Sequence, residues 1–188
     1  MENKRGKLFV YAGASGVGKG TIMKELLKKN ESIKLSVSAT TRSPREGEVD
    51  GREYFFVTKE KFKEMIAQEG FLEHAQYCDN FYGTPKAYVD EQLDKGYNVF
   101  LEIELQGAQN VLRLRPDAVS IFVMPPSVDE LERRLRTRGT ETEEAIIKRL
   151  SQAQVEMDNA KMYQYIIVND DLDKAVEDVL EVVRKETC

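Results

Sequence analysis

A glycine-rich segment near the start of the chain has the residue types and spacing of a phosphate-binding loop. It runs Gly13-Ala14-Ser15-Gly16-Val17-Gly18-Lys19-Gly20-Thr21. Glycines allow a tight turn that points backbone N–H groups inward, and a following helix N-terminus adds positive charge beside the Lys19 ammonium. Such a loop holds the β- and γ-phosphates of a nucleotide. The residues alone leave open an ordinary glycine-rich turn between a strand and a helix.

The residue after the lysine bears on metal binding. The usual pattern has Ser or Thr there, whereas this chain has Gly20 and places Thr21 one position later. We therefore expect no direct metal ligand from this loop. Mg²⁺ gives up its waters reluctantly, so phosphate oxygens and waters would hold it.

A second group of polar residues could bind another phosphate. Arg42 and Arg45 are three residues apart, and Tyr54 follows. Guanidinium groups donate charge-assisted hydrogen bonds to phosphate, and a phenol adds a further donor. The alternative is a pair of solvated surface arginines.

Scarce residue types exclude several other chemistries. His74 is the only histidine, and Cys78 and Cys188 are the only cysteines. A zinc cluster, a disulfide framework and a Cys–His nucleophile are therefore not expected, and we predict a cytoplasmic protein. The net charge of −5 gives no sign of a nucleic-acid partner. No segment approaches the ~18 apolar residues of a membrane span, so no membrane partner is expected.

Short apolar runs, each suited to a buried strand, alternate with amphipathic patterns. The runs are Leu8 to Ala12, Leu35 to Val37, Val99 to Ile103, Val119 to Met124 and Tyr165 to Val168. Alternation of strands and helices favours a parallel α/β sheet.

The helices between these strands have recognisable start signals and apolar stripes. Thr58 and Ser127 are expected caps, the latter with Glu130 as a capping box, and Asp170 or Asp171 precedes the last helix. Apolar residues at helical spacing then follow each start. They are Ile22, Leu26 and Leu27 after the glycine-rich loop, Phe62, Met65 and Ile66 after Thr58, Leu131 and Leu135 after Ser127, and Leu172, Ala175, Val176, Val179, Leu180 and Val183 at the end.

Two stretches depart from this alternation. Residues 38–85 mix turns, a short helix and a strand pattern at Tyr54 to Val57, which indicates an inserted α+β lobe. From Arg134 to Glu144 a basic run is followed by an acidic one without apolar period, and we expect a mobile surface segment between two helices.

These segments together resemble the guanylate kinases over essentially the whole chain. Residues 38–56 match the family's Thr-Thr-Arg-x-x-Arg…Glu…Gly…Tyr-x-Phe pattern position for position. The resemblance continues through 71–75, 82–84, 100–107, 125–127, 138–141 and 167–171. It implies Mg²⁺-assisted phosphoryl transfer from ATP to GMP, and dGMP is expected as a second acceptor. It leaves open whether the protein is a monomer or a homodimer.

The same resemblance implies a fold and a domain division. The fold would be a P-loop NTPase-type core with about five parallel strands flanked by helices, an inserted α+β GMP-binding lobe and a short helical lid. Residues 1–188 would form one domain, with its core at 1–37, 86–128 and 149–188, the lobe at about 38–85 and the lid at about 129–148.

The resemblance also implies roles for individual residues. The expected catalytic residues are Lys19, Arg42, Arg134, Arg138 and Arg149. ATP would contact residues 13–21 with Arg138 and Asn169. GMP would contact Ser38, Arg42, Arg45, Tyr54, Glu73, Tyr82, Thr84 and Glu104. Each of the three arginines at 134, 138 and 149 could instead be a surface helix charge.

Guanine recognition has a chemical rationale at Glu73. The pairing edge of guanine offers N1–H and N2–H₂, which one carboxylate can accept together, while Ser38 or Thr84 can donate to O6. Adenine would instead set a lone pair against the carboxylate, so such a site discriminates strongly. An exposed carboxylate is the alternative for Glu73, and a structural role is favoured for His74.

Two further carboxylates, Glu102 and Glu104, lie two apart on the strand expected beside the first strand. They would project to one face at the carboxyl end of the sheet, where open α/β sheets bind ligands. Glu102 could orient the water shell of magnesium. The pair could instead bond backbone amides at the end of the sheet.

Three other classes compete with this interpretation. Gly-Lys-Gly-Thr also resembles adenylate kinases, which does not explain the arginine–tyrosine segment. A non-catalytic module that binds phosphorylated protein segments would not need the intact loop with Lys19. A GTPase is disfavoured because no Asn-Lys-x-Asp motif follows a strand.

Overall fold

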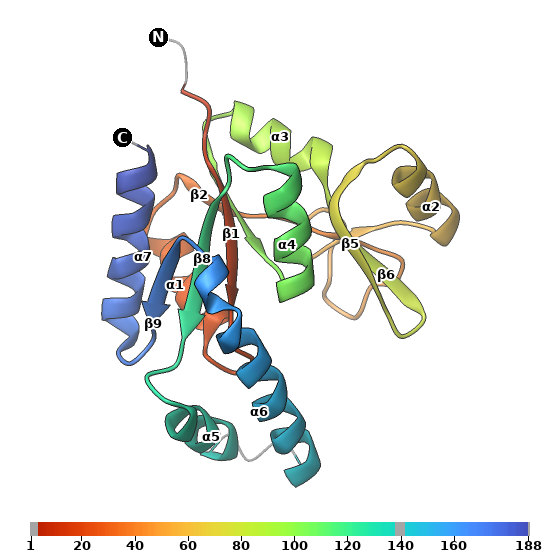
Figure 1. Ribbon diagram of the computed structural model, residues 1–188. Coiled ribbons are helices and arrows are strands. Elements are labelled where there is room, and N and C mark those ends of the chain that lie inside the picture. The colour runs from red at the N-terminus through yellow and green to blue at the C-terminus, as the bar shows by residue number, and fades with distance from the viewer. Residues whose placement is uncertain (1–3, 138–141, 188) are drawn as a thin grey trace. The chain divides into compact units, whose positions relative to one another are not determined.

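The computed structural model describes residues 4–137 and 142–187 and has the alternating α/β order expected (Figure 1). A five-stranded sheet has the order β2-β7-β1-β8-β9, and a four-stranded sheet has the order β4-β3-β6-β5. The prediction of a parallel sheet flanked by helices is therefore confirmed. In chain order the elements are β1 (Leu8–Gly13), α1 (Lys19–Lys29), β2 (Ile33–Leu35), β3 (Ala39–Thr40), β4 (Phe55–Phe56), α2 (Lys59–Ala67), β5 (Phe71–Tyr77), β6 (Asn80–Pro85), α3 (Lys86–Asp94), β7 (Asn98–Glu102), α4 (Leu105–Leu114), β8 (Val119–Met124), α5 (Val128–Thr137), α6 (Glu143–Asp158), the 3₁₀ turn η1 (Ala160–Met162), β9 (Tyr165–Val168) and α7 (Leu172–Thr187).

Residue contacts divide the chain into two units, each with its own packing. The first unit comprises Met1–Leu8 with Ser32–Ala118, and the second comprises Phe9–Glu31 with Val119–Cys188. The glycine-rich loop lies in the second unit, and the segment with Arg42, Tyr54 and Glu73 lies in the first. The expected division into core, lobe and lid stays a prediction.

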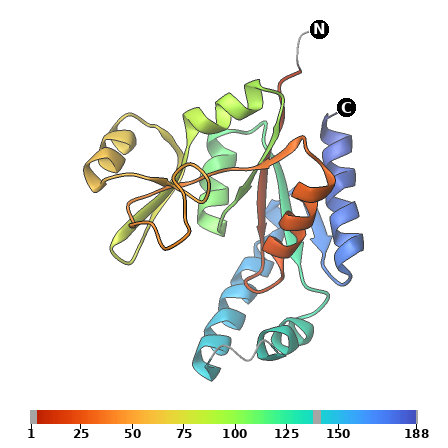
Figure 2. The same ribbon diagram turned by 180° about the vertical axis from the view of Figure 1, so that it is seen from behind.

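The second unit is built on β1, β8 and β9, which pair in parallel. Side chains of β1 and β8 are almost fully buried, as their apolar runs predict for strands covered on both faces. Helices α1 and α7 pack side by side (Figure 2). In α1 the apolar stripe differs from the prediction, because Met23 is buried beside Ile22 and Leu26 while Leu27 is 38% exposed.

The first unit contains the β2–β7 pair and the whole four-stranded sheet. The strand expected at Leu35 to Val37 is wrong by two residues, since β2 is Ile33–Leu35. The Ser36 N–H still donates to Phe100 O at 2.9 Å, and Ala39 already pairs with β6, so the chain leaves β7 after Ser36.

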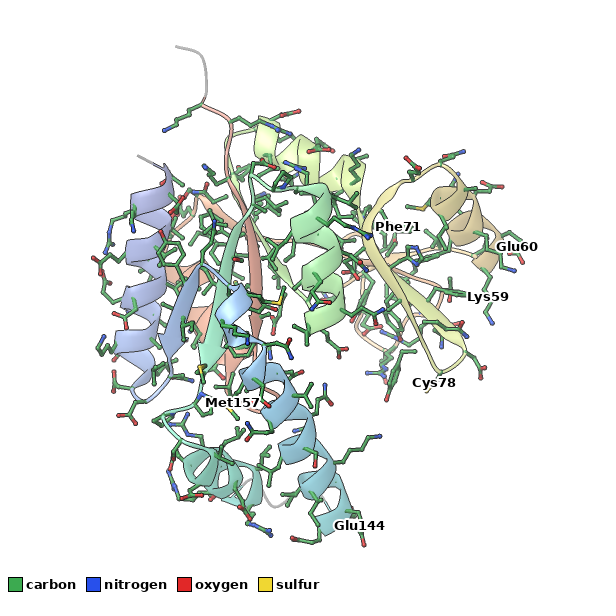
Figure 3. All side chains as sticks on the ribbon, in the orientation of Figure 1. Lys59, Glu60, Phe71, Cys78, Glu144 and Met157 are labelled. Carbon is green, nitrogen blue, oxygen red and sulfur yellow. The ribbon has the colours of Figure 1, made fainter. Side chains whose placement is uncertain are left out.

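The four-stranded sheet carries a small core of its own. Ala39, Phe62 and Phe71 are its buried residues, and the Phe62 and Phe71 rings stack at 4.4 Å. Of the strand expected at Tyr54 to Val57, Phe55–Phe56 pairs with β3, and Tyr54 forms an isolated bridge with Asp50. The β5–β6 hairpin runs from Phe71 at its base to a turn at Cys78 (Figure 3).

The expected caps are present at the helix starts. Thr58 accepts from the Lys61 N–H, and Ser127 Oγ accepts from the Glu130 N–H at 3.1 Å. Helix α5 extends to Thr137 and α6 begins at Glu143, so the irregular segment expected from Arg134 to Glu144 is wrong for its first four and its last two residues. Residues 138–141, including Arg138, lie outside the described residues. Within the described ranges, no helix is long and apolar enough to cross a membrane.

Candidate functional site

The glycine-rich loop connects β1 to α1 as a phosphate-binding loop does. Gly16 and Gly18 have φ of +83° and +97°, the left-handed region that favours glycine. Among the described residues, the N–H groups of Gly16, Gly18 and Gly20 have no acceptor. The Lys19 Nζ donates back to Gly13 O at 2.7 Å. The loop therefore gathers open donors and an ammonium group, which together suit an anion.

A cavity of about 410 Å³ lies beside this loop, lined by residues of α5 and by those that follow β9. The Asn169 side chain is 8% exposed and donates from Nδ2 to Val17 O at 2.8 Å. The Asn169 carbonyl accepts from Arg134 Nη1 at 2.8 Å. Two residues predicted from the sequence, Asn169 and Arg134, are thus brought together at the loop.

Glu130 holds Arg134 in this position. Its Oε1 accepts from Arg134 Nε at 2.7 Å. Hydrogen bonds from Arg133 and then Arg134 lower the pKa of the Glu130 carboxyl to about 2. Sequence reasoning assigned Glu130 only a capping role, although its position four residues before Arg134 is the spacing of a helical ion pair.

Gly18 should resist substitution for two separate reasons. An alanine there would adopt the unfavourable positive φ, and its Cβ would lie 2.9 Å from Asn169 Nδ2, which is itself hydrogen-bonded. We expect Gly18→Ala to lower the free energy of unfolding by about 1–3 kcal/mol. Denaturant unfolding of the nucleotide-free protein measures this.

Gly20 supplies the matched control in the same loop. A Cβ at Gly20 meets nothing within 4 Å, and the residue is helical without a positive φ. Gly20→Ala should therefore leave stability unchanged or raise it by up to ~1 kcal/mol. Equal destabilisation by the two substitutions would contradict this account of the loop.

Arg149 lies partly buried on α6, in the same unit as the loop. Its expected role at the phosphates stays a prediction, as does that of Arg138.

In the first unit, three residues expected around guanine lie in a row across neighbouring strands. Glu73 on β5 pairs with Thr84 on β6, and Ala39 on β3 pairs with Gly83. Continuing that antiparallel register by one residue brings Ser38 level with Thr84. The sheet therefore brings together the three residues Ser38, Thr84 and Glu73.

Glu73 is a largely buried carboxylate with one hydroxyl partner. Thr84, which is 1% exposed, donates from Oγ1 to Glu73 Oε1 at 2.6 Å. Burial raises the pKa of the Glu73 carboxyl above its usual value, although the Thr84 hydrogen bond opposes this shift. A Cβ at Gly107 on α4 would lie 3.3 Å from Glu73 Oε2, so the glycine leaves room for the carboxylate.

Glu104 and Glu102 mark the end of β7. Glu102 is the last residue of this strand, and Glu104 is the N-cap of α4, so only the first lies on the strand as expected. Both residues are exposed, and the Glu104 side chain does not cap the helix. The negative charge of Glu104 is close enough to Glu73 to raise the pKa of the Glu73 carboxyl further.

The residues expected at the GMP phosphate form an aromatic and basic group. The Arg42 guanidinium lies 5.5 Å from the centre of the Tyr54 ring, and the Tyr54 and Tyr82 rings meet edge to face at 6.0 Å. Arg45 is exposed, and among the described residues its guanidinium has no hydrogen-bond partner.

Glu48 organises this group and was missed by sequence reasoning. Its two carboxylate oxygens accept from Arg42 Nη2 at 2.9 and 3.0 Å, and Oε2 also accepts from the Arg45 N–H at 2.7 Å. The Arg42 guanidinium lowers the pKa of the Glu48 carboxyl, and Glu48 in turn raises that of Arg42. Glu48 follows Arg42 by six residues in a turn-rich stretch. This spacing matches no helical ion-pair period, so the sequence alone does not indicate that the two side chains meet.

The His74 ring lies against the aromatic core of the four-stranded sheet. Its centre is 6.0 Å from that of Phe71 and 6.5 Å from that of Phe62. His74 is nevertheless exposed, and the structural role favoured from the sequence stays a prediction.

The donor set suits a metal ion that arrives with its phosphates. In the described ranges, no group of three or more His, Cys, Asp or Glu side chains could hold a metal ion. Position 20 offers no hydroxyl, and space is open around it. Mg²⁺ keeps several waters and binds substrate phosphates, so these residues fit it without a dedicated protein cage.

A parallel sheet whose first strand leads through this glycine–lysine loop into a helix defines a P-loop nucleotide-binding protein of the α/β class. The family model described as guanylate kinase matches residues 5–186. The chain therefore belongs to the guanylate kinase family.

Individual relatives agree with this assignment. The guanylate kinase of Clostridioides difficile is 55% identical over 97% of this chain and 89% of its own length. That of Prochlorococcus marinus subsp. pastoris is 49% identical over 98% of this chain and its full length. The crystal structure of guanylate kinase from Anaplasma phagocytophilum matches with a TM-score of 0.73 at 35% identity, over 100% of this chain and 89% of that one. A shikimate kinase from Bacteroides thetaiotaomicron, 17% identical with a TM-score of 0.50 over 95% of this chain and 98% of that one, shares the fold.

Proposed function

We propose that this chain is a guanylate kinase, which transfers the γ-phosphoryl group of ATP to GMP and yields ADP and GDP. The observation that carries the proposal is the partly buried Glu73 carboxylate held by Thr84, in a chain that also has a phosphate loop with Lys19. The relatives of about 50% identity named guanylate kinase support the same activity. We propose dGMP as a second acceptor.

Glu73 selects guanine through its free lone pairs. One oxygen already accepts from Thr84, and the carboxylate retains capacity for the N1–H and N2–H₂ donors of guanine. Ser38 and Thr84 lie level on the sheet and complete the base site with Glu104. Adenine lacks the matching donors and would leave the remaining acceptor positions of this largely buried carboxylate unfilled, which is costly.

Arg42, Arg45, Tyr54 and Tyr82 bind the GMP phosphate. Glu48 fixes the Arg42 guanidinium in advance, so less side-chain freedom is lost when the phosphate binds. The phosphate is already mostly dianionic near neutral pH because its second pKa is ≈ 6. It therefore attacks the γ-phosphorus without a general base.

The ATP side of the reaction uses residues 13–21 and Asn169. Lys19 neutralises the donor phosphates, and Arg134, Arg138 and Arg149 stabilise charge that develops during in-line transfer. Phosphate oxygens and waters would hold Mg²⁺, Glu102 would orient that water shell, and the ion would supply further charge neutralisation. We also propose the core, lobe and lid boundaries given above, a cytoplasmic location, which cell fractionation tests, and no membrane or nucleic-acid partner.

The decisive experiment is a coupled assay of ADP release with GMP, dGMP, AMP and UMP as acceptors, with Mg²⁺ present. We expect rapid turnover with GMP, slower or comparable turnover with dGMP, and at least ~10⁴-fold lower kcat/KM with AMP. Equal turnover of AMP and GMP, or none with GMP, would refute the proposed function. Omission of Mg²⁺ with a chelator should abolish transfer.

A further inference from the structure

A buried carboxylate with no role in the sequence analysis lies against the phosphate loop. Glu156, on α6, is 8% exposed, and its Oε2 accepts from the Ser15 N–H at 2.7 Å. Its Oε1 accepts from Gln152 Nε2 at 3.1 Å. Glutamates are almost never so buried unless they are paired, so this contact with the loop calls for an explanation.

The place of Glu156 on its helix would ordinarily hold an apolar side chain. Ile146, Ala153 and Glu156 are the buried residues of α6, and their spacing puts them on one side of the helix. Figure 3 labels Met157, the neighbour of Glu156, and Glu144 towards the opposite end of the helix. The core-facing side of α6 thus carries an acceptor for a loop far away in sequence.

The hydrogen bonds divide the loop into two halves. In the upstream half, the Ala14 N–H donates to Val123 O at 3.1 Å and the Ser15 N–H donates to Glu156. Downstream, the three glycine N–H groups described above have no acceptor among the described residues. Of the other later donors, the Val17 N–H donates to Ala14 O and the Thr21 N–H to Gly18 O, so it is the three glycine N–H groups that stay open for phosphate.

We propose that Glu156 is a positioning residue for ATP binding: its hydrogen bond to the Ser15 N–H fixes the upstream half of the loop so that the downstream donors are already aimed at phosphate. Donors that are arranged before binding cost no reorganisation when the ligand arrives. The carboxylate also keeps the Ser15 donor away from the phosphates. The inference rests on the proposed use of this loop for ATP.

Three substitutions of Glu156 separate the effect of side-chain length from the effect of charge. Glu156→Gln keeps the length and an acceptor oxygen but loses the charge, whereas Glu156→Asp keeps the charge and is one methylene too short. Glu156→Ala loses both. We expect the Kd for ATP, measured by titration without GMP, to rise about tenfold in the Asp and Ala variants and less than about threefold in the Gln variant. The KM for GMP should stay within about twofold.

Hydrogen exchange gives a readout that needs no catalysis. Peptides covering residues 13–18 of the nucleotide-free protein should exchange faster in Glu156→Asp than in the wild type or in Glu156→Gln. The control is Gln152→Ala, which removes the other partner of the carboxylate and should leave the Kd for ATP unchanged. Melting curves identify any variant that does not fold. If Glu156→Ala does not fold, Glu156→Asp and Glu156→Gln still allow the comparison of ATP binding.

Three results would overturn the proposal. They are an Asp variant that binds ATP as the wild type does, a Gln variant as weak as Asp, and an equal loss of ATP and GMP affinity, which would indicate general damage. Because ATP binding and exchange are measured without an acceptor, these outcomes are separate from a failure of the wild type to phosphorylate GMP.

Discussion

Lys19→Met is expected to reduce kcat/KM by about 10³-fold or more, because it removes the one side-chain cation of the loop itself. Methionine keeps most of the aliphatic stem, so the change isolates the ammonium group. In the structure this group donates to Gly13 O, and the proposed mechanism requires it to turn to the phosphates when ATP binds. We therefore expect a small change in stability and a large one in transfer. Steady-state kinetics with GMP and ATP, together with melting curves, measure both.

Lys24→Met is the matched control for Lys19. Lys24 is an exposed lysine on the same helix, outside the loop. Lys24→Met removes one positive charge, as Lys19→Met does, so a general effect of net charge would appear in both variants. A Lys19→Met enzyme that retains more than a tenth of wild-type kcat/KM would remove Lys19 from the proposed mechanism.

Glu73→Gln is expected to lower kcat/KM for GMP by about 10²-fold, with little effect on the KM for ATP. The amide keeps the shape and one acceptor, but it replaces the other acceptor with an NH₂ group that faces the donors of guanine. The ratio of kcat/KM for GMP to that for AMP should fall accordingly. Assays with both acceptors measure this ratio.

The control for Glu73 is Glu64→Gln, an exposed carboxylate on α2 whose partner is Lys61. It should change neither the ratio nor the KM for either substrate. An unchanged ratio in Glu73→Gln would exclude this carboxylate from guanine recognition.

The raised pKa of Glu73 predicts the direction in which affinity for GMP changes with pH. Only the ionised carboxylate accepts from both guanine donors, so affinity for GMP should fall as the pH drops through this raised pKa, which lies above the ordinary value for a glutamate. The GMP phosphate also titrates, with its own second pKa near 6. The Gln variant should keep the phosphate-dependent decline and lose the part due to Glu73. Identical acid limbs in the two proteins would contradict this assignment.

The same shift predicts how stability changes with pH. Because the folded-state pKa is raised, protonation of Glu73 favours the folded state, and its contribution is fully present below the unfolded value of about 4.5. It is lost as the pH rises through the folded value. Relative to Glu73→Gln, the wild type should therefore lose stability across this interval, which denaturant unfolding at several pH values measures.

Local patterns in the sequence determined the α/β order, the caps at Thr58 and Ser127 and the glycine-rich loop. These features depend on neighbours within a few residues, as in the Ser127–Glu130 cap, or on short apolar runs. The burial expected for those runs fails at β9, where Ile166 and Val168 are exposed. The boundary of β2 was wrong for the opposite reason. Where that strand ends is decided by pairing with β7, which the residues at 33–37 do not encode alone.

Only the tertiary structure decided which carboxylates hold the residues of the candidate site in place. Glu48 reaches Arg42 across a turn, and Glu156 reaches Ser15 from a helix 141 residues later. Neither pair has the spacing of neighbours on one helix or strand, so the sequence does not indicate these contacts. They form only in the folded tertiary structure. The sequence by itself thus determined the phosphate loop and predicted a role for the carboxylate of Glu73, whereas folding decided how both are held.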